Sequence, residues 1–149
     1  MKKYNRLKNV LIVDDSDDIR FLLITALETH GLICFEASNG EEAIQILKST
    51  SVDLMITDFR MPKLDGVGLL EWCRNNEVHI PVIFTSANAD LLKSEQIALS
   101  DCCATLMLKP FCMDTFFTAL SSADERVHHK DCIHNKKSAV GLISKKYFD

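Results

Sequence analysis

The chain has 149 residues, of which 47% are hydrophobic and 26% charged, a composition typical of a soluble globular protein with one domain. No apolar run approaches the ~20 residues that a membrane-spanning helix needs, so we expect no membrane insertion. The N-terminus is basic, but the apolar segment behind it covers only residues 10–13 before Asp14. That segment is too short for a signal peptide, and the sequence therefore predicts a cytoplasmic protein.

Charge is divided unevenly along the chain, whose formal net charge is −4. Residues 1–124 carry 11 basic and 18 acidic side chains, whereas residues 125–149 carry 6 basic and 3 acidic ones. An acidic body does not favour nucleic-acid binding, so we expect no nucleic acid as a partner. We predict one folded domain over residues 1–124 and a basic, flexible tail over residues 125–149, because about 25 residues are too few for a second domain.

Apolar runs that suit buried strands alternate with segments of helical periodicity. Strands are predicted at residues 10–13, 32–37, 54–57, 80–85 and 104–108. Helices are predicted between Ser16 as N-cap and Gly31, from residue 41 onward, and over residues 66–75, 90–100 and 112–123. Five strands that alternate with five helices predict an α/β fold, with a parallel sheet covered by helices on both faces.

Polar side chains follow four of the five predicted strands, at the point where each strand ends. They are Asp14 and Asp15 after the first strand, Asp58 after the third, Ser86 after the fourth and Lys109 after the fifth. Because the carboxyl ends of parallel strands meet at one edge of the sheet, we expect these side chains to lie close together. By itself each has an ordinary interpretation, as a helix start, a cap or a surface charge, but together they predict a functional site.

Three carboxylates, a hydroxyl and an ammonium in one place favour phosphoryl transfer. Clustered carboxylates repel one another and therefore take up protons or bind a cation, and hard oxygen ligands suit Mg²⁺. Lys109 offers a point charge for phosphoryl oxygens, and the Ser86 hydroxyl can donate to one of them. An aspartate can also act as a nucleophile toward phosphorus. The set predicts phosphoryl transfer to an aspartate, with the metal and the lysine neutralising the developing charge.

The motifs around these residues resemble the receiver domain of two-component response regulators, and in particular its single-domain, chemotaxis-type members. The resemblance covers residues 8–124 in unbroken order and implies a flavodoxin-like strand order, 2-1-3-4-5. The stretches that carry it are Leu11-Ile12-Val13-Asp14-Asp15, Asn39-Gly40-Glu41-Glu42-Ala43, Thr57-Asp58-Phe59-Arg60-Met61-Pro62, Asp65-Gly66, Pro81-Val82-Ile83-Phe84-Thr85-Ser86-Ala87 and Lys109-Pro110-Phe111.

The resemblance implies that Asp58 is the phospho-acceptor and takes its phosphoryl group from a phosphohistidine. The donor would be a sensor histidine kinase or a histidine phosphotransfer protein. Asp15 and Asp58 would bind Mg²⁺ directly and Asp14 largely through water, with the main-chain carbonyl of Arg60 as a further ligand.

Lys109 would hold the phosphoryl oxygens, and Ser86 would swing in to bind the phosphoryl group and report it to the face built by the fourth helix, fifth strand and fifth helix. We therefore expect a single-domain response regulator that signals by phosphorylation-dependent binding of an unidentified downstream protein, or by phosphoryl relay. It would be no enzyme beyond its own phosphorylation and dephosphorylation.

The sequence departs from the family pattern at four positions. Leu106 stands three residues before the lysine, where the family usually has an aromatic ring that couples to the switch hydroxyl. Cys102 replaces a glycine at the end of the fourth helix, and left-handed geometry there would cost about 1–2 kcal/mol, unless the turn is reshaped. Arg60 and Asn88 occupy the two positions that tune the phosphoryl lifetime in the family.

Other interpretations stay open. Asp15-Ser16-Asp17 superficially matches a phosphohydrolase of the haloacid dehalogenase type, but that family needs a later acidic pair where this chain has Ser86-Ala87-Asn88. Leu106 also leaves room for a receiver that serves only as a phosphorylation-independent scaffold.

The six cysteines show no CxxC spacing and are expected to be reduced and mostly buried. Histidines and a cysteine in the tail match no zinc pattern, although the tail could dock an acidic partner.

Overall fold

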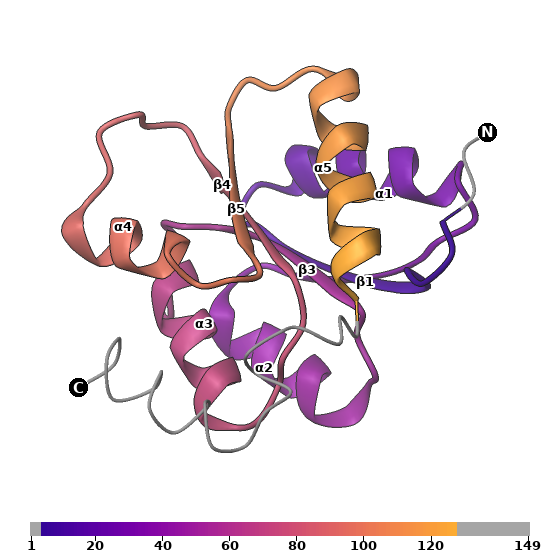
Figure 1. Ribbon diagram of the computed structural model, residues 1–149. Helices are drawn as coiled ribbons and strands as arrows, with labels where there is room; N and C mark the ends of the chain where they lie inside the picture. The colour runs from indigo at the N-terminus through magenta and orange to yellow at the C-terminus, as the bar shows by residue number, and fades with distance from the viewer. Residues whose placement is uncertain (1–3, 128–149) are drawn as a thin grey trace.

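The computed structural model describes residues 4–127, in which five strands alternate with five helices (Figure 1). The strands are β1 (Asn9–Val13), β2 (Ile33–Ala37), β3 (Leu54–Asp58), β4 (Val82–Ser86) and β5 (Ala104–Leu108). The helices are α1 (Asp17–Glu28), α2 (Gly40–Ser49), α3 (Gly66–Asn75), α4 (Lys93–Leu99) and α5 (Met113–Arg126). The predicted tail, with its His128, His129, Cys132 and His134, lies outside the described residues.

The strands form one parallel sheet in the order β2-β1-β3-β4-β5. This arrangement confirms the predicted α/β class and the flavodoxin-like strand order. Because β1 lies between β2 and β3, the connections cross over the sheet in two directions, and helices cover both faces. In Figure 1, α1 and α5 lie on one side of the sheet, and α2 and α3 lie on the other.

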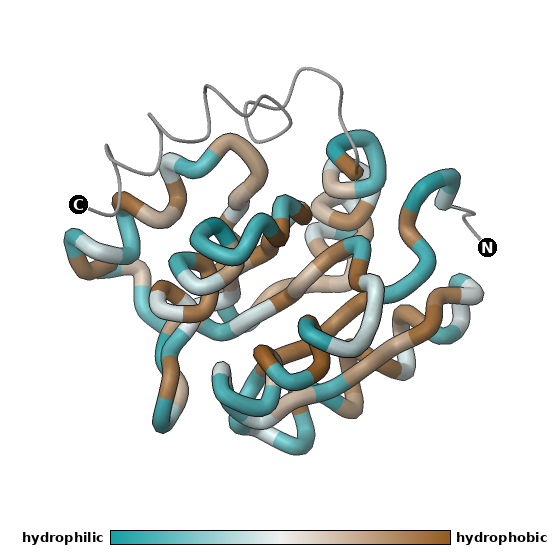
Figure 2. The backbone as a smooth tube through the Cα atoms, turned by 90° about the horizontal axis from the view of Figure 1, so that it is seen from below, coloured by the Kyte–Doolittle hydropathy of each residue, from teal (hydrophilic) through white to brown (hydrophobic). Residues whose placement is uncertain are grey.

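Alternate residues of the central strands pack into two separate cores. Val10 and Ile12 of β1 join the core that contains α1 and α5, whereas Leu11 and Val13 join the core beneath α2, α3 and α4. Because side chains of a strand alternate between faces, an apolar run without polar interruptions is what a strand buried on both faces requires. Figure 2 shows these apolar strands running through the middle of the molecule.

Local capping explains where three of the helices begin. The side chains of Ser16, Asn39 and Asp65 accept hydrogen bonds from backbone N–H groups three residues further on, which begins α1, α2 and α3. Gly31 follows α1 with a φ of +79°, a conformation that glycine adopts without strain, and this confirms it as the stop.

Several predicted boundaries differ from the observed ones. The predicted helix over residues 90–100 begins only at Lys93, because Leu92 is extended and its own side chain offers no capping acceptor. Strands β3 and β4 include Asp58 and Ser86, one residue beyond their predicted ends. Helix α5 continues to Arg126 instead of ending at residue 123.

The turn between α4 and β5 answers the question raised by Cys102. Lys63 and Glu77 are the only non-glycine residues with positive φ in the described part of the chain, so Cys102 is not left-handed. The turn is reshaped around Asp101, whose carboxylate accepts the Cys103 N–H at 3.0 Å. Arg74 of α3 also binds that carboxylate with two hydrogen bonds of 2.9 and 3.0 Å.

The cysteines are less uniformly buried than predicted. Cys73 and Cys103 are buried and Cys34 is half-buried, but Cys102 and Cys112 are exposed. Burial raises the pKa of the Cys34 thiol to about 11 and that of Cys73 to about 12, so both are poor nucleophiles.

No helix within residues 4–127 has the length and apolar character needed to cross a bilayer.

Candidate functional site

The carboxyl edge of the sheet brings the predicted site residues together. Asp58 is the last residue of β3, Ser86 is the last residue of β4, and Asp14 and Lys109 directly follow β1 and β5. The Lys109 N–H donates to the Ser86 carbonyl at 2.7 Å, which extends the parallel pairing to the site itself. Side chains that are 95 residues apart in the chain, Asp14 and Lys109, are thereby placed in contact.

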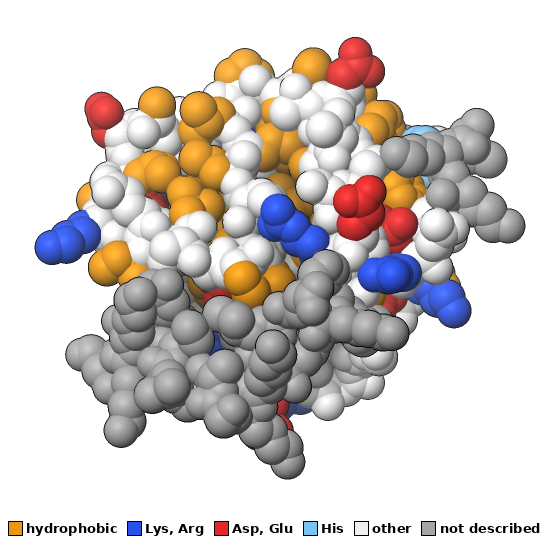
Figure 3. Space-filling model, in the orientation of Figure 1, with side chains coloured by type: hydrophobic (Ala, Val, Ile, Leu, Met, Phe, Trp, Pro, Cys, Tyr) orange, Lys and Arg blue, Asp and Glu red, His pale blue; other side chains and the backbone are white. Residues whose placement is uncertain are grey.

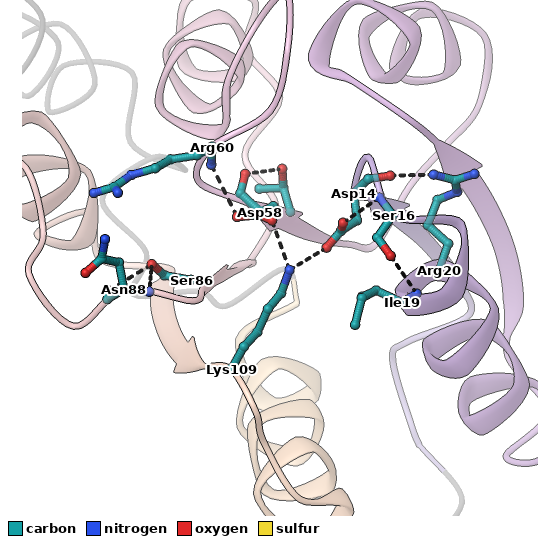
Figure 4. A network of polar contacts seen from close by, with 10 residues as sticks. Asp14, Ser16, Ile19, Arg20, Asp58, Arg60, Ser86, Asn88 and Lys109 are labelled. Atoms are coloured by element: carbon teal, nitrogen blue, oxygen red, sulfur yellow. Dashed lines mark hydrogen bonds and ion pairs between the residues drawn. The ribbon is translucent and has the colours of Figure 1, made fainter.

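The Lys109 ammonium joins two of the carboxylates. Its Nζ donates to Asp14 Oδ2 and to Asp58 Oδ2, each at 2.9 Å (Figure 4). Burial acts to lower the pKa of Lys109, but the two hydrogen-bonded carboxylates outweigh this effect and hold the pKa above its ordinary value. The lysine is therefore a fixed positive charge at the centre of the site.

The pKa of Asp58 reflects how poorly the site accommodates its negative charge. Burial raises the pKa of its carboxyl group above the ordinary 3.8, helped by the neighbouring Asp14, although Lys109 and the Arg60 N–H act to lower it. That N–H donates to Asp58 Oδ1 at 3.2 Å. An ionised Asp58 is therefore incompletely compensated by the protein, and additional positive charge at this place would stabilise it.

The three carboxylates form a candidate cation site. Asp14, Asp15 and Asp58 each offer an oxygen, and these oxygens lie within 4.8 Å of one another. Asp15 is exposed while Asp14 is buried, so the cluster is open to water on the Asp15 side. The Lys109 ammonium balances one of the three negative charges, and a divalent cation would balance the other two. An oxygen donor set with access to water fits Mg²⁺.

Arg20 supports the cluster from α1, a residue that the sequence analysis missed. Its guanidinium donates to the main-chain carbonyl of Asp14, pairs with Asp17, and binds Glu36 at 2.9 Å. The Asp14 carboxylate also accepts the Ser16 N–H at 2.9 Å. These bonds fix the turn that carries Asp14. The i,i+3 spacing of Asp17 and Arg20 was the only local signal of this arrangement.

The segment after Asp58 is held by close packing. The Phe59 ring is fully buried and stacks on Phe84 of β4, with 4.3 Å between ring centroids. Gly66 lies directly against the Asp58 main chain, where an added Cβ would be 2.4 Å from the Asp58 carbonyl oxygen. Only glycine therefore lets α3 begin this close to Asp58, and that closeness fixes the loop on which the carboxylate sits.

Ser86 is buried, but its hydroxyl is turned away from Asp58 (Figure 4). The hydroxyl donates to the carbonyl of Asn88 at 2.9 Å and accepts the Asn88 N–H at 3.1 Å. The Asn88 side chain is exposed. Ser86 would have to exchange these two bonds before it could reach a group on Asp58.

Arg60 also points away from Asp58, toward α4 (Figure 4). Its Nε and Nη2 donate to the two carboxylate oxygens of Glu95, each at 3.1 Å, and Nη2 lies 3.4 Å from the Asp90 carbonyl. Glu95 holds the pKa of Arg60 above its ordinary value, and Arg60 holds that of Glu95 below its own. The sequence analysis singled out Arg60 but missed Glu95, which lies 35 residues away and on another element.

Leu106 is half-buried on β5 and lines a groove of about 420 Å³ between β5 and α5. The other lining residues include Thr105, Met107, Thr115 and Thr118. Figure 3 shows apolar side chains gathered over the face of the molecule that carries α4, β5 and α5. This is the face to which the resemblance assigns signal output, and its role in this chain stays a prediction.

With this geometry established, comparisons identify the family. The model of the response regulator receiver domain matches residues 10–121. The receiver domain of an HD domain-containing protein from Pseudomonas fluorescens superposes with a TM-score of 0.76 at 26% identity, covering 84% of this chain and all of that one. A Thermotoga maritima response regulator in complex with Mg²⁺-BeF gives 0.67 at 29% identity, covering 78% of this chain and 99% of that one. The chain therefore belongs to the response regulator receiver family of two-component systems.

Curated relatives share this domain within longer proteins. A probable transcriptional regulator of Cyanidium caldarium is 44% identical over 91 residues, 61% of this chain and 36% of that protein. The sensor histidine kinase RcsC of Salmonella typhimurium is 31% identical over 118 residues, 79% of this chain and 12% of that protein. The chain thus spans about a third or less of these relatives. Some relatives are transcriptional regulators, so the expected absence of a nucleic acid partner stays a prediction.

Proposed function

We propose that Asp58 accepts a phosphoryl group from a phosphohistidine and that the chain signals through its phosphorylated state. The donor would be a sensor histidine kinase or a histidine phosphotransfer protein. The observation that carries this proposal is the Lys109 ammonium, held 2.9 Å from both Asp14 and Asp58 within a cluster of three carboxylates. A fixed cation beside a nucleophilic carboxylate is what the transfer of a negatively charged phosphoryl group requires.

In the proposed reaction, an Asp58 carboxylate oxygen attacks the phosphorus atom. The new P–O bond forms as the P–N bond to the donor histidine breaks, and the electron pair of that bond returns to the imidazole, which takes up one proton. Asp15 and Asp58 would hold Mg²⁺ directly, Asp14 through water, and the Arg60 carbonyl would complete the protein ligands. The ion, when bound, neutralises charge on the phosphoryl oxygens. Lys109 contributes in the same way from the opposite side.

The proposed output begins with Ser86. Its hydroxyl would leave Asn88 and bind a phosphoryl oxygen, and this exchange would alter the loop between β4 and α4. The altered loop would change the affinity of the α4-β5-α5 face for a partner. Alternatively, the chain would pass the phosphoryl group on in a relay. A separate basic tail is part of the same proposal, although the predicted boundary at residue 124 falls inside α5, which continues to Arg126. Membership of the receiver family supports this proposal over the hydrolase alternative, and Leu106 keeps a phosphorylation-independent scaffold as the second candidate.

Phosphorylation with a small donor tests the proposal. The protein is incubated with Mg²⁺ and acetyl phosphate, and its intact mass is measured. We expect the gain of one phosphoryl group, which EDTA prevents and Asp58→Ala abolishes, while Asp18→Ala, at an exposed position of α1, keeps it. A phosphoryl group that still appears on Asp58→Ala would show that the acceptor is another residue. Phosphorylation that leaves partner binding unchanged would favour the scaffold.

A further inference from the structure

The Arg60–Glu95 pair joins the loop after the phospho-acceptor to the first turn of α4. Both guanidinium nitrogens that face Glu95 donate to it at 3.1 Å, which is the two-pronged geometry of a strong arginine–carboxylate pair. The two partners differ in exposure, since the Glu95 side chain is 2% exposed and that of Arg60 is 44% exposed. The carboxylate is therefore covered while Arg60 is in place, and the arginine itself lies at the surface and can rearrange.

Glu95 has a second bond that ties it to the start of α4. Its Oε1 accepts the N–H of Leu92 at 2.8 Å. Leu92, at the N-cap position, has no side-chain acceptor of its own, so this bond is the side-chain stabilisation of the first turn. Glu95 thus links the position of Arg60 to the geometry of the helix start.

Arg60 begins next to the place where a phosphoryl group would sit. Its backbone N–H already donates to Asp58 Oδ1 at 3.2 Å, so the side chain of Arg60 starts directly beside that region. A phosphoryl group brings close to two negative charges and three acceptor oxygens. Arginine binds such groups with two parallel hydrogen bonds, as it binds Glu95. A phosphoryl group on Asp58 therefore competes with Glu95 for the same guanidinium.

We propose that Glu95 is a positioning residue of the phosphorylation site. It holds Arg60 away from Asp58 in the unphosphorylated protein, and a phosphoryl group takes the guanidinium over. The exchange leaves the Glu95 carboxylate without its counter-charge and with the Leu92 N–H as its remaining partner, which is costly until water solvates it. The first turn of α4 must then move so that water reaches Glu95. This link carries phosphorylation to α4 without an aromatic ring at position 106, and it rests on the proposed function of Asp58.

Beryllofluoride, added with Mg²⁺ to the whole chain, can test the link because it mimics a phosphoryl group on an aspartate. Glu95→Gln removes the charge that attracts Arg60, yet glutamine still accepts the Leu92 N–H. Since Glu95 no longer competes, we expect Glu95→Gln to tighten beryllofluoride binding by roughly threefold or more. Arg60→Gln should weaken binding, and the double variant should behave like Arg60→Gln alone. Glu71→Gln, which removes an exposed charge from α3, is the matched control and should leave binding unchanged.

The backbone amide NMR signals of α4 provide a second readout. Beryllofluoride should shift the signals of Lys93–Leu99 in the wild type and in Glu71→Gln. In Arg60→Gln the shift at the start of α4 should be clearly smaller, and the part that remains is the part that Ser86 transmits. If Glu95→Gln binds beryllofluoride with wild-type affinity, or if the α4 shift in Arg60→Gln is as large as in the wild type, the inference is wrong. Neither result would contradict the phosphorylation of Asp58. If Glu95→Gln does not fold, the Arg60→Gln comparison decides. A wild-type protein that takes up neither phosphoryl nor beryllofluoride would contradict the proposed function itself.

Discussion

Helix α4 is held at both ends by an arginine–carboxylate pair, and the two pairs differ in their exposure to solvent and in the other partners of the arginine. At the end of α4, Arg74 binds Asp101 with side chains that are 2% and 7% exposed. Arg74 also donates to the carbonyls of Val78 and Ile80, at 2.8 and 3.2 Å. At the start of α4, Arg60 is 44% exposed and makes one long additional contact, to the Asp90 carbonyl.

The difference in exposure makes the Arg74–Asp101 pair a fixed contact and allows the Arg60–Glu95 pair to be released. Arg74 is enclosed and has its donors occupied by several partners, so leaving Asp101 would expose a buried charge without replacement. Arg60 can exchange Glu95 for another anion while it stays in contact with solvent. A helix that is fixed at its end and releasable at its start can respond at the edge of the sheet that carries Asp58 without loss of the fold.

Removal of the buried arginine should have the largest effect on stability. Arg74→Met keeps most of the apolar stem but leaves the Asp101 carboxylate buried without its partner, and we expect the free energy of unfolding to fall by about 3–5 kcal/mol. Urea denaturation measures this change. The double variant Arg74→Met, Asp101→Leu should recover much of the loss. A loss below about 1 kcal/mol for the single variant, the level of an exposed pair, would remove the distinction between the two ends of α4.

Magnesium should stabilise the protein through the carboxyl edge of the sheet alone. At about one hundred times its dissociation constant, Mg²⁺ should raise the free energy of unfolding by ~2.7 kcal/mol, since it binds only the folded state. EDTA should reverse the gain, and Asp15→Asn should reduce it, because Asp15 supplies one of the clustered oxygens. Asp18→Asn, an exposed neighbour on α1, is the control. A gain that persists in Asp15→Asn would place the cation elsewhere.

A smaller effect should follow from the pH dependence of Asp58. Because burial raises the pKa of this carboxyl group above 3.8, the folded state binds a proton more readily than the unfolded state. Without Mg²⁺, the ionised group therefore costs stability at neutral pH. The cost shrinks as pH falls below the raised pKa and is gone below 3.8, where the unfolded state is protonated as well. Asp58→Asn should be more stable than the wild type at pH 7, and the difference should narrow toward pH 4. A difference that widens on acidification would contradict the direction of the shift.

Arg60→Gln should have the smallest effect on stability. The arginine is partly exposed, and glutamine can still donate a hydrogen bond to Glu95, so we expect the free energy of unfolding to fall by about 1–2 kcal/mol, between the losses of an exposed and a buried pair. Urea denaturation under the conditions used for Arg74→Met provides the direct comparison. A loss as large as that of Arg74→Met would mean that the start of α4 is as firmly fixed as its end.

Much of the fold could be predicted because its signals are local. The uninterrupted apolar run of β1, the caps at Ser16 and Asp65, and the stop at Gly31 each depend on a few adjacent residues. The start of α4 could not be predicted, since its first turn depends on Glu95, whose conformation is set by a residue of another loop. Propensity placed the helix start three residues too early for that reason.

The candidate site divides in the same way. The parallel sheet brings Asp14, Asp58 and Lys109 to one edge whatever the rotamers of the side chains, so the sequence alone determined that a charged cluster exists and which residues form it. Only the tertiary structure decided which way Ser86 and Arg60 point, because a side-chain rotamer depends on partners that lie near it in space. The pairs that hold α4 join residues 35 and 27 positions apart, and no local pattern reports such contacts.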